Sequence, residues 1–345
     1  MARNGSAPTV THMHDLAHAA GVSPATVSRV FNPATVHLVK AATRQRVVRL
    51  AQELGYTPNR SASALSSGIT RSIALVFPHT THFTESTFDV NVLTHTVATL
   101  QPAGFDVKVH FLPPRPGRVD ISQLAAHLAV DGLIFAGIPR AYQLTQLTMP
   151  QAPRVVMLSS YKLAHVAAVD ADNKAAGKRA ADYFIACGHT ALGMLTGPAD
   201  SQNAIDRTAG FRAAVRSANL PQRNRWFAPC DYGIDDGEAA ARKLLGRTAR
   251  PTALFCASDE IALGALRAIR ALGLDCPDDV SLIGFDNAQA TAHTTPPLTT
   301  FAQNFDVMVP AAIELLLAQL NGGGGCARHT FAAQLIERAS VARRT

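Results

Sequence analysis

The stretch HDLAHAAGVSPATVSRVFN, residues 14–32, decides the fold of the N-terminal part of the chain. Its apolar and polar residues follow helical spacing as far as residue 20, and Gly21 can adopt the positive φ of a tight turn. Ser23 stands where a helix N-cap is expected, and Pro24 suits the first helical position. The stretch therefore predicts two short helices joined by a glycine turn.

A third helix is predicted over residues 40–54, where helical spacing resumes before Gly55 ends it. In the second helix, residues 24–31, Val27 and Val30 face inward and the outward positions hold small or hydrogen-bonding side chains. Three short helices with a glycine turn between the first two describe a helix-turn-helix. The second helix of this motif enters the major groove of DNA.

The distribution of charge also indicates a nucleic-acid partner. The chain of 345 residues has a formal net charge of +7. Residues 1–68 contain seven Lys or Arg and two acids, hence +5, whereas the remaining 277 residues carry only +2. A basic N-terminal unit followed by a nearly neutral remainder is the electrostatic pattern of a phosphate-binding module attached to a second domain.

Longer motifs in the same region resemble a known family. The pattern D-L-A-x3-G-V-S-x2-T-V-S-R-V-x-N at 15–32 is followed by T-R-x-R-V at 43–47 and L-G-Y-x-P-N at 54–59. Together these motifs resemble the N-terminal region of the lactose/galactose repressor family. The resemblance implies a ligand-responsive transcriptional regulator that binds a near-palindromic operator in double-stranded DNA as a homodimer.

The resemblance also implies which side chains meet DNA. In the family, the two residues after the turn serine and an arginine four positions further read base edges, and here these are Pro24, Ala25 and Arg29. The Arg29 guanidinium can bond guanine bidentately, whereas the other two offer only apolar contact. Hydroxyl side chains of the same helix are expected to hold phosphates. The expected DNA-binding set is Ser23, Pro24, Ala25, Thr26, Ser28, Arg29, Asn32, Tyr56, Asn59 and Leu65.

A hinge follows the three helices. Residues 59–67 are small or polar except for Leu65, and so short a helix is marginal in water on its own. The segment is similar to the family's hinge helix, in which the matching leucine is wedged into a minor-groove base step and kinks the duplex. A flexible linker whose leucine contacts its own domain is the alternative.

From Arg71 onward, β-branched runs alternate with helical stretches, which predicts parallel sheets covered by helices on both faces. More than about six strands suggest two lobes, and ligands of such folds bind beyond the carboxyl ends of the strands. The predicted strands are residues 73–77, 105–111, 132–136, 154–158, 191–195, 252–256 and 280–285, with a further strand-like run from Thr330 to Leu335.

This region resembles the core of the same repressors. The motifs D-N-x3-G at 172–177, R-x2-G-F at 207–211, D-x2-A-x-G-A at 259–265 and G-F-D at 284–286 are similar to a two-lobed, periplasmic-binding-protein-like domain. The resemblance implies that Arg207 and Asp286 contact the effector in the cleft, where a forked donor facing a bidentate acceptor can hold adjacent hydroxyls. Pairing of these two side chains across the lobes is the alternative. The expected effector-binding set is His79, Ser159, Arg207, Tyr232, Ser258, Asp286, Gln303 and Phe305, with Phe77 as a further part of an apolar floor.

The fold class expected from both regions is an all-α helix-turn-helix head plus an α/β two-lobed, periplasmic-binding-protein-like core. The predicted divisions are an N-terminal tail at 1–12, a DNA-binding domain at 13–58, a hinge helix at 59–70 and an effector-binding and dimerisation domain at 71–345. No leucine heptads follow the last strand-like run, so a dimer rather than a tetramer is expected. A four-glycine run at 322–325 is interpreted as a surface loop.

Other functional classes lack their signatures. No P-loop, G-x-S-x-G elbow or H-E-x-x-H motif is present, and the thirteen histidines and five cysteines are scattered without a C-x-x-C pair. We therefore expect neither an enzyme nor a cofactor or metal. The first 21 residues show no signal-peptide pattern and no segment reaches the about 18 apolar residues of a membrane span, so a cytoplasmic protein without a membrane partner is expected. A periplasmic sugar receptor, the rival with a similar core, would lack the basic head.

The predicted function is repression released by a small molecule, a sugar or sugar derivative being the class that the resemblance implies. A co-repressor that strengthens operator binding is the alternative. Ser258, Ser159 and Ala136 depart from the residues that the family usually has at these cleft positions, and this leaves the identity of the effector open.

Overall fold

The computed structural model describes residues 12–31, 35–57, 69–145, 154–323 and 325–344. The chain divides into two compact units, Met1–Thr70 and Arg71–Thr345, which we call the head and the core. Within the described residues, every helix is too short or too polar to cross a membrane.

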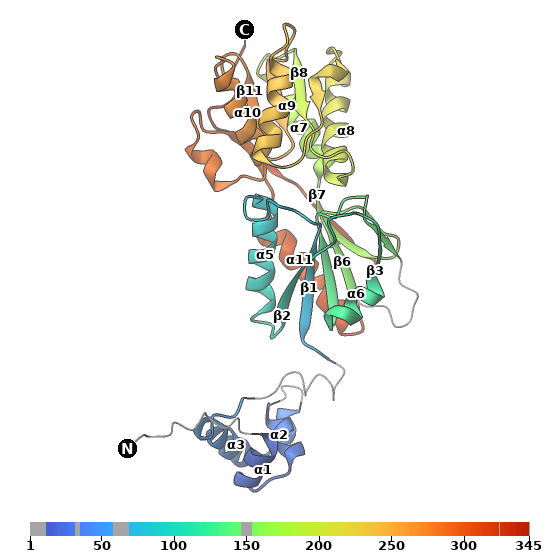
Figure 1. The fold of residues 1–345 in the computed structure, drawn as a ribbon, viewed down its shortest axis with the longest axis vertical. Coiled ribbons are helices and arrows are strands. Elements are labelled where there is room, and N and C mark those ends of the chain that lie inside the picture. Colours follow the sequence, from blue (N-terminus) through green and yellow to red (C-terminus); the bar gives the residue numbers. More distant parts are fainter. Residues whose placement is uncertain (1–11, 32–34, 58–68, 146–153, 324, 345) are drawn as a thin grey trace, which may run out of the picture. The chain divides into compact units, whose positions relative to one another are not determined.

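The head is a three-helix unit around a small apolar core. Gly21 has a φ of 58°, as the predicted turn requires, and the Ser23 hydroxyl accepts a hydrogen bond from the Thr26 amide at 3.2 Å. Leu16, Val27 and Val47 are fully buried where the helices meet. The predicted helices are confirmed as α1 (Met13–Ala19), α2 (Pro24–Phe31) and α3 (Ala41–Glu53), with a 3-10 turn at Val36–Leu38 before α3 (Figure 1).

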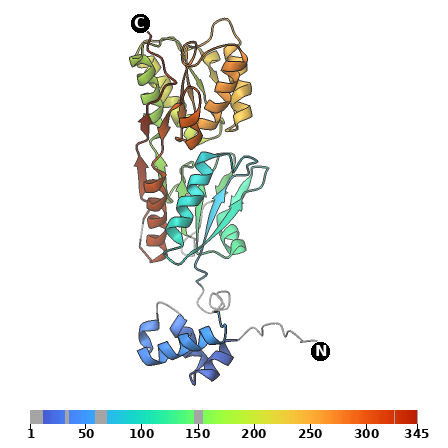
Figure 2. The same cartoon turned by 90° about the vertical axis from the view of Figure 1, so that its left-hand side faces the viewer.

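The core consists of two α/β lobes, each with a six-stranded sheet, which confirms the predicted architecture (Figure 1). In lobe 1 all six strands are parallel, in the order β13-β7-β6-β4-β1-β2. These strands are β1 (Ser72–Phe77), β2 (Asp106–Phe111), β4 (Gly132–Ala136), β6 (Arg154–Leu158), β7 (Ala167–Ala171) and β13 (Arg328–Phe331). Helices α5 (Thr87–Leu100) and α11 (Phe305–Leu320) lie side by side on one face (Figure 2), and α6 (Ile121–Leu128) packs on the other beside a ribbon of β3 (Arg118–Asp120) and β5 (Gln143–Thr145).

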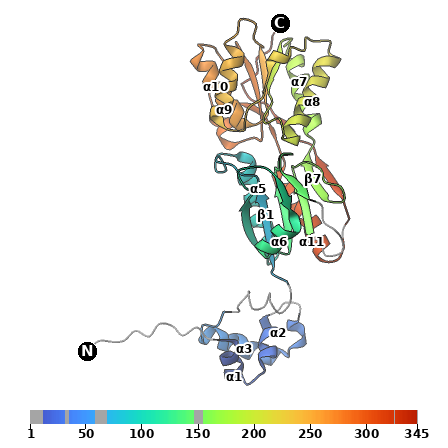
Figure 3. The same ribbon diagram turned by 45° about the vertical axis from the view of Figure 1, so that its right-hand side comes forward.

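Lobe 2 has the order β14-β12-β11-β10-β8-β9, parallel except for β14. Its strands are β8 (Leu192–Leu195), β9 (Phe227–Ala228), β10 (Ala253–Cys256), β11 (Ser281–Phe285), β12 (Thr299–Ala302) and β14 (Gln334–Ile336). The helix pairs α7 (Asn173–Ala186) with α8 (Gln202–Ser217) and α9 (Ile234–Leu245) with α10 (Asp259–Ala271) flank the sheet (Figure 3). Two 3-10 turns, Asn224–Trp226 and Gln289–His293, complete the lobe.

Glycine pairs bring the helices of each lobe 2 pair into backbone contact. A Cβ atom on Gly177 of α7 would lie 1.9 Å from the carbonyl oxygen of Arg207 on α8, and one on Gly210 of α8 equally close to the carbonyl of Lys174. Gly237 and Gly264 do the same for α9 and α10. Because glycine has no side chain, α7 and α8 can approach this closely, and the contact sets the position of α8, which carries Arg207.

The chain passes between the lobes three times: from β7 to α7, from β12 to α11, and from β13 to β14. The predicted single strand from Thr330 to Leu335 is wrong, because the run straddles the third passage. β13 extends the sheet of lobe 1 beside β7, and β14 pairs antiparallel with β12 in lobe 2. Strands β7 and β12, which precede the first two passages, were not among the predicted strands.

Candidate functional site

A cavity of about 430 Å³ lies between the two lobes of the core. Its walls are loops that follow the strands of both sheets, for example at Pro78 after β1, Gly137 after β4, Pro198 after β8 and Asp286 after β11. The predicted location of the site, beyond the carboxyl ends of the parallel strands, is thus where the structure has its cavity. The N-cap serines of α5, α8 and α10 also line it: Ser86, Ser201 and Ser258.

Six residues of the expected effector-binding set line this cavity, namely His79, Arg207, Tyr232, Ser258, Asp286 and Gln303. Ser159 and Phe305 do not. Ser159 is buried at a backbone φ of 48°, and its carbonyl accepts a hydrogen bond from the Asn203 side chain. Phe305 is buried in lobe 1 under Phe88, 5.9 Å between ring centroids, and Phe88 takes its place on the cavity wall. Phe77 is likewise enclosed in the core of lobe 1 and forms no part of the floor.

Arg207 is held almost entirely inside the protein, with 4% of its surface exposed. Its Nη1 donates to Asn173 Oδ1 at 2.7 Å, its Nη2 donates to the Tyr232 hydroxyl at 3.4 Å, and its guanidinium stacks on Phe285 at 4.1 Å from the ring centroid. Its Nε has no hydrogen-bond partner among the described residues. A buried guanidinium with an unmet donor beside a cavity is suited to binding an acceptor group of a ligand.

Asp286 is the acceptor that the sequence paired with Arg207. It follows β11 with a φ of 112°, a conformation that costs energy outside glycine and is concentrated at functional sites. Gln303 donates to its Oδ1 at 2.5 Å. Burial raises the pKa of the Asp286 carboxyl to about 8, Glu260 adds to the rise, and Arg207 opposes it.

The alternative of an Arg207–Asp286 pair across the lobes does not fit the geometry. Both side chains belong to lobe 2, because α8 and β11 are parts of the same lobe. Within the described ranges, no ion pair of 4.0 Å or less joins them. Each is therefore available to a third group in the cavity.

Hydrogen bonds from lobe to lobe surround the cavity. The Thr87 amide at the start of α5 donates to Glu260 Oε1 at 2.9 Å, and the Arg140 amide donates to the Asp200 carbonyl at 3.0 Å. Near the crossing strands, Asn203 Nδ2 donates to the Ser159 carbonyl at 2.9 Å. These bonds join the two lobes directly.

A polar network leads from the cavity to the crossing strand β7. Asn173, which binds Arg207, also donates through Nδ2 to Asp170 Oδ1 at 3.0 Å. Burial raises the pKa of Asp170 to about 7, while the nearby Ala171 amide and Arg207 lower it. The residues predicted for the site did not include Asp170, Asn173 or Asn203. The D-N-x3-G motif, which contains Asn173, was the signal that could have indicated it.

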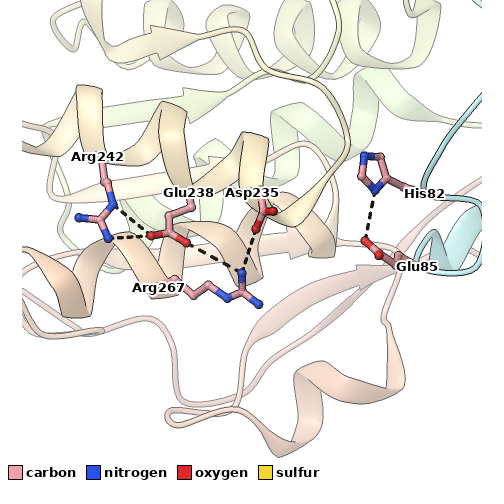
Figure 4. Close-up of polar contacts among 6 residues, drawn as sticks. All are labelled: His82, Glu85, Asp235, Glu238, Arg242 and Arg267. Carbon is pink, nitrogen blue, oxygen red and sulfur yellow. Dashed lines mark hydrogen bonds and ion pairs between the residues drawn. The ribbon is translucent and has the colours of Figure 1, made fainter.

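Exposed ion pairs mark the outer parts of lobe 2 and the cavity rim (Figure 4). His82 Nδ1 lies 3.4 Å from Glu85 Oε2 at the rim. On α9 and α10, Arg267 contacts Asp235 at 3.0 Å and Glu238 at 3.9 Å, and Glu238 also binds Arg242. Such exposed pairs contribute little to stability because water screens them.

The head presents its expected DNA-binding residues on one helix. Ala25, Ser28 and Arg29 are exposed on α2, while the Ser23 hydroxyl is engaged as the N-cap of that helix. Tyr56 is half-buried against Phe31, 5.7 Å between ring centroids, so much of its ring belongs to the head core. Asn32, Asn59 and Leu65 lie outside the described residues. Among the residues that are described, no group of three His, Cys, Asp or Glu side chains is arranged to hold a metal ion.

Comparisons with known proteins match both units. The family "Bacterial regulatory proteins, lacI family" matches residues 12–59, and "Periplasmic binding protein-like domain" matches residues 181–341. The HTH-type transcriptional regulator CelR of Thermobifida fusca is 33% identical over 312 residues, which cover 88% of this chain and 90% of that protein.

Solved structures agree with these matches. The transcriptional regulator CelR–cellobiose complex has a TM-score of 0.69 at 27% identity, over 96% of this chain and 99% of that one. The lac repressor dimer bound to operator and the anti-inducer ONPF has a TM-score of 0.81 at 23% identity, over 97% of this chain and all of that one, which supports the fold.

Proposed function

The chain belongs to the lacI family of bacterial regulatory proteins and is a transcriptional regulator, and from this premise we propose that it is a repressor released by a sugar. In this proposal a homodimer binds a near-palindromic operator through its two heads. A small polyhydroxylated molecule in the cavity of the core lowers the affinity for that operator. No catalytic step is involved.

The proposal rests on one observation: Arg207 and Asp286 both line the lobe 2 wall of the cavity. A buried forked donor with an unmet N–H and a buried acceptor, neither ion-paired with the other, together suit the adjacent hydroxyls of a sugar. Phe88 on the opposite lobe offers an apolar surface for a ring. The cellobiose complex of the relative CelR supports a sugar as the ligand class.

The DNA-binding half of the proposal rests on α2. Arg29 is exposed with no ion pair among the described residues, which leaves its guanidinium available for guanine. Ser23, Thr26 and Ser28 supply phosphate contacts and hence orientation rather than sequence selectivity. Leu65, as the family resemblance implies, is the wedge of the hinge.

Coupling between the two sites follows from the construction of the core. A ligand that bonds to both lobes competes with or adds to lobe-to-lobe bonds such as Thr87–Glu260, and so changes how the lobes are held. A coupling free energy of about 1 to 3 kcal/mol is typical of such regulators. Such a coupling changes the affinity for the operator about 5- to 150-fold.

The test combines two measurements on the full-length protein. Thermal-shift measurements against neutral mono- and disaccharides identify ligands, since a ligand at 100 times its Kd adds about 2.7 kcal/mol of stability. Fluorescence anisotropy with an operator selected from random duplexes then measures DNA affinity with and without each ligand. We expect release. Tighter operator binding would mean a co-repressor and overturn the proposed sign.

A matched pair of variants links the ligand to the cavity. Asp286→Asn is expected to lose ligand binding, whereas Asp182→Asn, an exposed partner of Lys178 on α7, is expected to retain it. Unchanged ligand affinity in Asp286→Asn would remove this residue from the proposed site.

A further inference from the structure

The cavity wall is strongly acidic for a site of its size. Seven carboxylate side chains line it, against Arg207 as its single Lys or Arg among the described residues. Three of the seven face the cavity from different lobes: Asp89 belongs to α5 of lobe 1, and Glu260 and Asp286 belong to lobe 2. Glu260 and Asp286 are 6% and 8% exposed, so water screens them poorly.

These three carboxylates act on one another. Burial raises the pKa of Asp89 to about 7, against a hydrogen bond from Ser86, and Glu260 raises it further. Glu260 and Asp89 also raise the pKa of Asp286. Within the described part of the chain, none of the three has a Lys, Arg or His within ion-pair distance. Above about pH 8, where Asp89 and Asp286 lose their protons, the wall therefore holds more negative charge than Arg207 neutralises.

Helix N-termini normally attract anions, and several point at this cavity. At α5 a carboxylate of the chain takes up this position, and at α8 and α10 the N-cap serines accept a helix amide and an acid lies nearby. Glu260 Oε1 accepts the Thr87 amide at the start of α5 at 2.9 Å, Asp89 stands in the first turn of the same helix, and Asp200 lines the cavity just before α8. An anionic group of a ligand would meet a carboxylate at these positions instead of a free amide.

The single guanidinium is also largely committed. Arg207 donates from Nη1 to Asn173 and from Nη2 to Tyr232, which leaves only Nε without a partner. A guanidinium has five N–H groups, so single N–H groups remain that can hold a hydroxyl or an ether oxygen. A phosphate or a carboxylate is held most strongly by two parallel N–H groups, and an anion that takes both arms of this fork competes with Asn173 and Tyr232.

We propose that the cavity selects its effector by charge: it takes a polyhydroxylated ligand that is uncharged or bears an amine, and Asp89 and Glu260 reject the same skeleton when it bears a phosphate or a carboxylate. This inference rests on the proposed sugar-responsive function and narrows its ligand class. The rejection is electrostatic, because an added anion is placed in a poorly hydrated site beside like charges. An ammonium group, in contrast, gains carboxylate partners.

The test uses matched ligand series in isothermal titration calorimetry with the full-length protein at about pH 9, above the pKa values of Asp89 and Asp286. Glucose, galactose and mannose are each compared with their 2-amino and 6-phosphate derivatives, and cellobiose with cellobionate. In the series that contains a binding sugar, we expect the amino sugar to retain binding and the anion to bind at least about a hundredfold more weakly, equivalent to about 2.7 kcal/mol. An anion that binds as tightly as its parent sugar overturns the inference and leaves the regulatory function standing.

Variants separate charge from size. Asp89→Asn and Glu260→Gln keep the volume of the side chains, and the amide introduced by Glu260→Gln keeps an oxygen for the Thr87 backbone N–H. If charge causes the rejection, both variants reduce the ratio of the Kd for the sugar phosphate to the Kd for the sugar at least about tenfold. Asp182→Asn, outside the cavity, leaves this ratio unchanged. A ratio that stays the same in both cavity variants means rejection by size and overturns the inference. Absence of binding in every series overturns the proposed function together with this inference.

Discussion

The head and the core present their candidate sites in opposite ways. In the head, Arg29 and its neighbours lie exposed on a helix whose inner face is already packed, so the site costs the fold little. In the core, Arg207 and Asp286 are buried beside a cavity, and burying these charged groups lowers the stability of the folded protein. Substitutions at the head site should therefore change DNA binding without changing stability, whereas substitutions at the core site should change both. Four predictions test this difference.

The largest effect is expected from Gly177→Ala, which attacks the packing that positions Arg207. The added Cβ would lie 1.9 Å from the Arg207 carbonyl oxygen, so α7 and α8 must separate. We expect a loss of about 3 kcal/mol or more. For a unit of this size this lowers Tm by about 6 °C or more in differential scanning calorimetry. Gly117→Ala is the control, because a Cβ there has no atom within 4 Å, and an equal loss in both variants would contradict the packing argument.

A smaller effect, confined to DNA binding, is expected from Arg29→Ala. Loss of a bidentate guanine contact costs about 1 to 3 kcal/mol of operator affinity and relaxes selectivity at one base pair. Fluorescence anisotropy on the selected operator and its point variants measures both. Tm should remain that of the wild type, since the side chain is exposed on α2. Ser28→Ala, which loses only an expected phosphate contact, should weaken binding to all duplexes alike, and an equal, unselective loss in Arg29→Ala would refute base reading.

A third, still smaller effect is a pH dependence located in the core. The folded-state pKa of Asp89 is raised from 3.8 to about 7, so its contribution to stability is complete below about pH 4 and is lost as pH rises through 7. Asp89→Asn should therefore be more stable than the wild type at pH 8 by at least about 1 kcal/mol, and the difference should shrink towards pH 5. Urea unfolding of the ligand-free protein at several pH values measures this. A constant difference across the range would show that Asp89 does not titrate as stated.

The smallest effect is expected at the exposed ion pairs of α9 and α10. Arg267→Gln removes the contacts to Asp235 and Glu238. The side chains of Arg267 and Asp235 are 57% and 94% exposed, and the longer contact to Glu238, 23% exposed, spans 3.9 Å. The change in the free energy of unfolding should be below about 0.5 kcal/mol. Urea unfolding in low and high salt checks this. A larger loss of unfolding free energy would mean that exposed residues of the core also affect its stability, against the proposed difference between exposed and buried sites.

The sequence predicted the head more completely than the core because the head's signals are local. A glycine turn, an N-cap serine and two inward valines specify α1 and α2 without reference to distant residues. In the core, strand-helix alternation predicted the two lobes and a site beyond the strand ends. The family resemblance supplied Arg207 and Asp286, which together with Gln303 line the cavity.

What the sequence did not predict depends on long-range arrangement. Phe88, Asp89 and Glu260 enter the cavity from helix N-termini, and no local pattern says which helix starts face the other lobe. Ser159 was expected in the site because it follows a predicted strand, and Phe305 was expected in its apolar floor, yet packing turns both into the interior. The Thr330–Leu335 run has one continuous strand pattern, although its two ends join different sheets.

The third passage between the lobes has a consequence for the order in which a ribosome completes this protein. Residues 12–57 hold every helix described in the head, so that unit is complete early. Lobe 1 begins at Ser72 but waits for α11 and β13, which are made after nearly all of lobe 2. Met308, Ile313 and Leu316 of α11 fill its core beside α5, so part of one face of its sheet stays uncovered until then. A nascent chain stalled before α11 would thus display a finished DNA-reading head attached to a core that exposes its apolar sheet to chaperones and proteases.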